Sequence, residues 1–160
     1  MDISARLASL LELKQDEALL QYRDSWTAIG DLRRHATAFD ALLAGYGLGP
    51  QSQVGLITRN RPGHVAAIVA VLSTGRCLVP ITSIQSETAT LAEIDRLGLT
   101  VVAADPDDLA RPGLVDGCSA RGVHVLGLPA TAAADVSAVV TAAATRGAAT
   151  VPGVAVLMPT

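Results

Sequence analysis

Basic and aromatic residues are scarce in this chain, and their scarcity argues against nucleic-acid binding. The 160 residues include one lysine, Lys14, and carry a formal net charge of −3. The four aromatic residues, Tyr22, Trp26, Phe39 and Tyr46, all lie in the first third of the sequence. Nucleic-acid binding needs clustered Lys and Arg to neutralise phosphates, and commonly aromatic rings to stack on bases. Neither feature is present in the sequence.

Cysteine and long apolar runs are also scarce. Cys77 and Cys118 are isolated, and their spacing matches no metal site or disulfide framework. The apolar run at 65–72 is too short to cross a bilayer, and the N-terminal segment lacks the order of a signal peptide. We therefore expect a cytoplasmic protein with no membrane span and no metal ligands.

Charged residues make up only 17% of the chain, whereas half of the residues are hydrophobic. Ordinary globular domains carry about a quarter charged residues. The chain can build one core, but it has little polar surface for a free-standing domain. We therefore expect exposed apolar surface through which the chain self-associates.

Apolar runs alternate with amphipathic stretches, which predicts an α/β fold. The expected strands are short apolar runs at 53–58, 77–81, 100–105, 123–128 and 153–158. Helical spacing of apolar residues predicts helices over about 3–13, 31–43, 62–73 and 90–97, and a short helix within 106–122. Such alternation is typical of βαβ units, so we predict a mainly parallel sheet with helices on both faces.

The chain divides into four segments around this core. Residues 1–28 form a helix and an extended arm with a turn at Asp24–Ser25, and 29–128 form the βαβ core. The Ala- and Thr-rich connection at 129–152 is either a helix around 135–144 or an ordered linker. Residues 153–160 form a strand that leads toward a loop.

Two glycine-containing segments partly match the motifs of known functional loops. "GYGLGP" at 45–50 resembles a dinucleotide-binding loop, but it follows a helix and precedes a strand, the reverse of what that loop requires. "GCSARG" at 117–122 approaches the nucleophile elbow, but Arg121 stands where the second glycine is needed. A helix stop and a surface turn explain these motifs better.

Asp105, Asp107 and Asp108 follow a predicted strand, at the edge of the sheet where open α/β folds bind ligands. The cluster could hold Mg²⁺, but a receiver domain would also need a lysine after a later strand. Carboxylates that stabilise a helix N-terminus explain the cluster better. The single histidines, His35, His64 and His124, have no partners at metal-ligand spacing and fit structural roles.

Residues 25–83 resemble the N-terminal part of the adenylate-forming enzymes, the superfamily of acyl- and aryl-CoA synthetases, peptide-synthetase adenylation domains and luciferases. "RNRPGHVAAIVAVLSTGRCLVPI" at 59–81 follows the family pattern of an Asn-x-Pro turn, a helix and a strand with Val-Pro. The final "VAVLMPT" resembles the strand that leads into the family's phosphate loop. Gly63 and Glu93 depart from the pattern; some CoA-forming relatives have an arginine at the latter position.

The resemblance implies an incomplete N-terminal subdomain of an acyl-CoA-synthetase-like fold. Its parent would be an ATP-dependent, AMP-forming ligase that uses Mg²⁺, activates a carboxylic acid and passes the acyl group to CoA or a carrier-protein thiol. Thr160 would be the first residue of the nucleotide-binding phosphate loop. No catalytic residue is expected within 1–160, and this chain alone is expected to be inactive with no bound cofactor.

An alternative from another class remains open. The chain could be a free-standing flavodoxin-like binding or regulatory module, with its ligand over the strand ends near Asp105. The sequence encoded after residue 160 separates the two hypotheses: a Gly- and Thr-rich loop favours the enzyme, whereas a stop codon favours the module.

Overall fold

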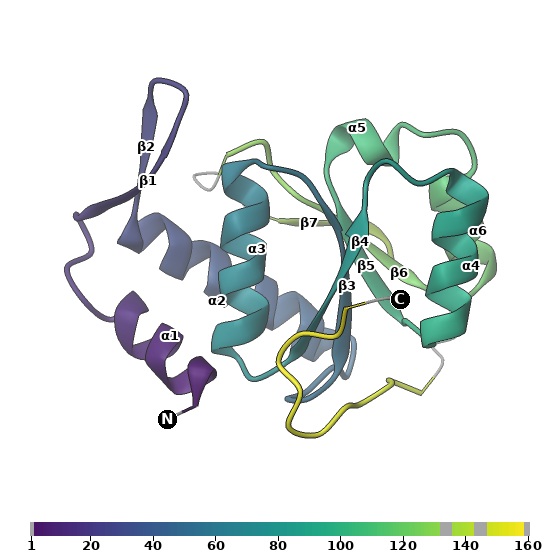
Figure 1. Cartoon of the computed structure of the whole chain (residues 1–160), viewed down its shortest axis with the longest axis horizontal. Helices are drawn as coiled ribbons and strands as arrows, with labels where there is room; N and C mark the ends of the chain where they lie inside the picture. Colours follow the sequence, from purple (N-terminus) through teal and green to yellow (C-terminus); the bar gives the residue numbers. More distant parts are fainter. Residues whose placement is uncertain (1, 132–135, 143–146, 159–160) are drawn as a thin grey trace.

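A computed structural model describes residues 2–131, 136–142 and 147–158. It shows a five-stranded sheet between helices, and a two-stranded hairpin at one end of the molecule (Figure 1). The sheet strands, in spatial order, are β4 (Cys77–Thr82), β3 (Gln53–Thr58), β5 (Val101–Ala104), β6 (His124–Gly127) and β7 (Ser137–Val140). The first four strands are parallel, and β7 is antiparallel to β6. The predicted α/β class with a mainly parallel sheet is confirmed.

Helices cover both faces of the sheet (Figure 1). One face carries α1 (Ile3–Leu11), α2 (Ile29–Gly45) and α3 (Pro62–Ser73), and the other carries α4 (Glu87–Leu97) and α6 (Leu114–Ala120), with the short α5 (Pro106–Leu109) at the sheet's edge. Neighbouring strand residues alternate between two cores. Leu56 packs with α2 and α3, whereas Ile57 packs with α4 and α6. This two-sided burial explains why the strands are uninterrupted apolar runs.

The predicted βαβαβ unit is confirmed, because β3 pairs in parallel with both β4 and β5. Pro62 occupies the first turn of α3, where its missing N–H costs nothing. The predicted start of α4 near Thr90 is wrong by three residues. Ser86 caps this helix by accepting a hydrogen bond from the Ala89 N–H at 3.2 Å, and Gly98 ends the helix with a φ of +64°.

Arg76 joins α2, its following loop and β4 at the amino edge of the sheet. Its side chain is 3% exposed and donates to the Leu48 carbonyl from Nε at 3.0 Å and from Nη2 at 2.7 Å. Its Nη1 also pairs with Asp40 at 2.5 Å. These bonds satisfy a guanidinium that would otherwise be costly to bury.

The sequence left a helix around 135–144 or an ordered linker open for the Ala- and Thr-rich connection. Among the described residues 136–142, Ser137–Val140 form the strand β7, which pairs with β6, so these four residues are not helical. The strand expected at 153–158 is reduced to one parallel bridge between Val156 and Leu78 of β4. A turn at Gly153, with a φ of +73°, leaves only a short extended stretch beside β4.

The expected extended arm is the hairpin of β1 (Ala18–Tyr22) and β2 (Ser25–Ala28). Its turn is at Arg23 and Asp24, one residue before the predicted turn, and Arg23 has a φ of +54°. The hairpin projects from the body above α1 and leads directly into α2 (Figure 1).

Candidate functional site

The carboxyl edge of the sheet brings together charged residues from two neighbouring strands. Arg59 and Arg61 follow β3, and Asp105, Asp107 and Asp108 follow β5. Because β3 and β5 are adjacent and parallel, their carboxyl ends meet. From β3 the chain passes to β4 on one side of β3, and it then crosses to β5 and β6 on the other side. The carboxyl ends of β3 and β5 therefore flank the topological switch point of the sheet.

Arg59 makes a two-pronged contact with Asp108. Its Nε donates to Oδ2 at 2.7 Å and its Nη2 donates to Oδ1 at 2.9 Å. Arg61 bridges two carboxylates, with Nη1 2.7 Å from Asp105 Oδ2 and Nη2 2.5 Å from Asp107 Oδ2. The side chains of Asp105 and Asp108 are fully buried, so these arginines neutralise charges that water does not reach.

Asp105 also begins α5, because its Oδ1 accepts a hydrogen bond from the Asp108 N–H at 3.1 Å. The sequence interpretation of this aspartate as a helix-terminus residue is therefore confirmed. Arg111, beyond α5, approaches Asp108 at 3.7 Å and donates to the Gln85 carbonyl at 2.7 Å. Three arginines and three aspartates form this arginine–aspartate network, so their formal charges cancel.

The network shifts the proton affinities of its members. The hydrogen bond to Asp108 raises the pKa of Arg59, against the opposing effect of burial. The hydrogen bond to Asp107 raises the pKa of Arg61 in the same way, and the bond from Arg61 lowers the pKa of Asp107. The Arg59 and Arg61 guanidiniums and the Asp107 carboxylate are therefore held in their charged forms.

His64 lies in the first turn of α3, beside the network, and is 1% exposed. Burial lowers the pKa of His64, and the charge of Arg61 lowers it further, while Asp105 opposes the shift. The neighbouring Gly63 packs directly under the Pro129 carbonyl, where a Cβ would clash. A glycine is therefore needed where the family pattern has a glutamate, and this contact fixes the loop after β6 against α3.

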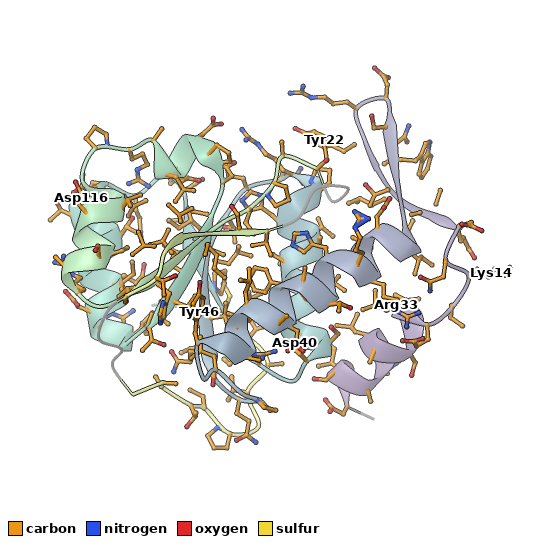
Figure 2. The ribbon with its side chains drawn as sticks, turned by 180° about the vertical axis from the view of Figure 1, so that it is seen from behind. Lys14, Tyr22, Arg33, Asp40, Tyr46 and Asp116 are labelled. Carbon is orange, nitrogen blue, oxygen red and sulfur yellow. The ribbon has the colours of Figure 1, made fainter. Side chains whose placement is uncertain are left out.

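A cleft of about 580 Å³ opens beside the network, between the hairpin and the body. The hairpin contributes five lining residues, namely Tyr22, Arg23, Ser25, Trp26 and Thr27. The body contributes Asp31, Arg61, Pro62, Asp107 and the loop at 130–131. Figure 2 shows Tyr22 on the side of the hairpin that faces the body. Small-molecule sites commonly measure about 300–1,000 Å³, so the cleft is large enough for a ligand.

The residues singled out from sequence fall in different places. Asp105, Asp107 and Asp108 come together, but arginines occupy them, and no group of three or more His, Cys, Asp or Glu within the described ranges could hold a metal. Thr160 lies outside the described residues. The "GCSARG" segment is the end of helix α6 and the turn after it, not a strand-to-helix elbow. "GYGLGP" is the end of α2 and a loop.

His124 has the structural role expected from sequence. Its ring stacks on Tyr46 with centroids 3.9 Å apart, and its Nδ1 accepts a hydrogen bond from the Ala142 N–H at 3.1 Å. These contacts fasten the end of α2 and the residues after β7 to β6. His35, 0% exposed, stacks near Phe39 in the core between α2 and the sheet.

The arginines of the network were missed by the sequence interpretation. Arg59 and Arg61 follow one predicted strand, and the three aspartates follow the next. The carboxyl ends of parallel strands meet at one edge of a sheet, so the sequence could place all of these charges at the same edge. It could not pair them, because it does not give the strand order that makes β3 and β5 direct neighbours.

The solved structures that superpose on this chain include CoA ligases and a nonribosomal peptide synthetase. A benzoate CoA ligase from Burkholderia xenovorans LB400 superposes with a TM-score of 0.69 over 90% of this chain, at 16% identity. The anthranilate CoA ligase AuaEII, solved with anthranoyl-AMP, gives 0.67 over 80% at 15% identity, and the nonribosomal peptide synthetase FmoA3 gives 0.65 over 79% at 19%. This chain has the fold of the N-terminal part of adenylate-forming enzymes.

The adenylate-forming fold is present only in part. The chain spans 30% of the benzoate CoA ligase, 25% of the anthranilate CoA ligase and 14% of the peptide synthetase. No family model matches the sequence, and no curated protein matches it. None of the described helices is long and apolar enough to cross a membrane.

Proposed function

We propose that the chain is the N-terminal scaffold of an enzyme that activates a carboxylic acid with ATP and Mg²⁺, and then transfers the acyl group to the thiol of CoA or a carrier protein. The observation that carries the proposal is the superposition on the benzoate CoA ligase over 90% of the chain. The segment 59–81 holds the clearest sequence resemblance. It contains the turn after β3, the helix α3 and nearly all of β4.

The charges at the carboxyl edge support a scaffold role for these residues. ATP phosphates must be met by cations and by oriented N–H donors. Arg59 and Arg61 are instead engaged by buried and half-exposed carboxylates, which would repel a phosphate. The described residues therefore do not fit a nucleotide or its Mg²⁺, and we assign no catalytic step to them.

One observation favours the alternative of a flavodoxin-like binding module. The order β4–β3–β5–β6 is a doubly wound order, and in such sheets ligands bind at the switch point, which here lies between β3 and β5. In this chain the arginine–aspartate network fills that position. The topology therefore suits a module, but the chemistry of the strand ends favours the scaffold.

Calorimetry on the 160-residue chain distinguishes these functions. We expect no tight binding of Mg-ATP, flavin mononucleotide or inorganic phosphate, because the arginines are already neutralised. Micromolar flavin or phosphate binding that disappears in Arg61→Gln, but persists in the distant surface control Arg96→Gln, would favour the module. Tight Mg-ATP binding would show that the nucleotide site lies within these residues.

A further inference from the structure

The strand β7 is the least buried strand of the five-stranded sheet. It lies at the end of the strand order, beside β6. Three of its four residues are exposed, and the fourth, Val140, is half-buried. The register with β6 shifts by one residue, which leaves Val139 without a partner across the pair. Segments with few buried contacts open at a lower free-energy cost than the core of a sheet.

A side-chain hydrogen bond joins the residues after β7 to the start of β6. His124, the first residue of β6, accepts the Ala142 N–H at Nδ1 over 3.1 Å. The His124 ring is buried and stacks on Tyr46, which follows α2 (Figure 2), with the two ring planes 11° apart. Because β6 and β7 are antiparallel, this bond closes the end of the strand pair opposite to their connection.

The bond to Ala142 requires a neutral histidine. An imidazole nitrogen accepts a hydrogen bond only when it carries no proton, so the single proton of neutral His124 is on Nε2. That Nε2 atom is buried, with no hydrogen-bond partner among the described residues. A second proton would have to bind Nδ1, where its N–H would point at the Ala142 N–H. Protonation therefore replaces the hydrogen bond with two donors that face each other.

No described charge compensates a proton on His124. Burial is the cause that shifts the pKa of this histidine, and it lowers the pKa. The ring stacks on Tyr46, lies opposite Val101 of β5 and bonds to Ala142, and of these only Tyr46 has a titratable group, a phenol that is uncharged in mild acid. Stacking on Tyr46 would attract a cation, but it would not restore the bond to Ala142.

We propose that His124 is a pH-sensitive latch: the neutral ring holds residues 136–142 on β6, and protonation in mild acid releases them. Opening favours the protonated ring, because water can then solvate its charge. The closed form is therefore fully favoured above the ordinary histidine pKa of about 6.5, and the open population rises by at most about tenfold for each pH unit below it. Release exposes the N–H and C=O groups of β6 as a free sheet edge.

Backbone hydrogen exchange on the 160-residue chain tests the latch. Protection factors, corrected for the intrinsic effect of pH on exchange, are measured at about pH 7.5 and about pH 5.5, on either side of the ordinary histidine pKa. The Ala142 amide and the amides of β7 should lose protection in acid, by up to about tenfold for one coupled proton. At both pH values they should be less protected than the amide of the buried Leu56 in β3, because they exchange by local opening.

Two substitutions of His124 separate its charge from its hydrogen bond. His124→Asn places an amide oxygen near the position of Nδ1 and does not titrate, so protection of residues 136–142 should become independent of pH. His124→Leu removes the acceptor and should lower the protection of the Ala142 amide at both pH values. The matched control is His64→Gln, which removes another buried histidine and should leave the pH dependence of this segment as in the wild type.

Three results would overturn the proposal. The first is equal protection of residues 136–142 at both pH values in the wild type, a measurement that needs no variant. The second is a pH dependence that persists unchanged in His124→Asn but disappears in His64→Gln. The third is protection equal to that of Leu56, which would mean that the segment opens only when the whole chain unfolds. Circular dichroism of each variant at both pH values establishes that the chain is folded.

Discussion

Individual side chains fix the carboxyl edge of the sheet, and Arg59 is the clearest example. It is 30% exposed, yet its partner Asp108 is fully buried, so removing the guanidinium leaves a carboxylate that water cannot solvate. Breaking a buried pair by removing one partner costs about 3 kcal/mol or more. We expect Arg59→Met to lower the free energy of unfolding in urea by about this amount.

The matched control for Arg59 is Arg96→Met. Arg96 is 51% exposed and pairs with Glu93 along α4 at 3.3 Å. Exposed pairs of this kind contribute less than about 1 kcal/mol. Equal effects of the two substitutions would show that the network at the strand ends is no stronger than a surface ion pair.

The buried histidines predict a loss of stability in mild acid. Burial lowers the pKa values of His64 and His124 below the ordinary value of about 6.5. Between that value and the lower folded pKa, the unfolded chain binds more protons than the folded chain, so stability is full above about pH 6.5 and falls as the pH drops through it.

The measurement is the urea midpoint at about pH 7.5 and about pH 5.5, on either side of the ordinary histidine pKa. The midpoint should be lower at the acidic pH, and the double variant with His64→Gln and His124→Gln should show a smaller difference. An equal or higher wild-type midpoint in acid would mean that these histidines protonate freely in the folded chain.

At the scale of elements, sequence predicted the parts that repeat a simple pattern. The strands β3, β4, β5 and β6 were placed to within one or two residues because both of their faces are buried. The segment 137–140 was left open between a helix and a linker because its Ala, Ser and Val residues have no decisive pattern, and its pairing with β6 makes it a strand. The arginine–aspartate network was not predicted from sequence, because it depends on the strand order of the folded sheet.

Gly55, at the centre of β3, offers a test of this packing. A Cβ there would lie 2.9 Å from Leu99 Cδ1 and 3.1 Å from Val102 Cγ2. We expect Gly55→Ala to destabilise the chain by about 1–3 kcal/mol through overpacking. Gly45→Ala, at the end of α2 with open space around it, should be neutral or stabilising by up to about 1 kcal/mol. If Gly55→Ala leaves the free energy of unfolding unchanged, β3 does not lie in close contact with Leu99 and with Val102 of β5.

At the scale of the whole molecule, the chain combines a two-sided α/β core with a carboxyl edge whose opposite charges pair with one another. Its strands β3–β6 are buried on both faces, whereas β7 is largely exposed, and a hydrogen-bonded network holds the carboxyl edge. The solved structures that share this fold are much longer than this chain, which spans 14–33% of them. These facts are the basis of the scaffold role that we propose.

Carboxylate-dependent exchange of pyrophosphate into ATP tests this account most directly. The assay compares the 160-residue chain with the polypeptide that its gene encodes, whatever the length, across short-chain, aromatic and long-chain acids. We predict exchange with at least one acid by the natural polypeptide and none by residues 1–160 alone. Exchange by the 160-residue chain would place the active site within it, and failure of the natural polypeptide with every acid would contradict the adenylate-forming role.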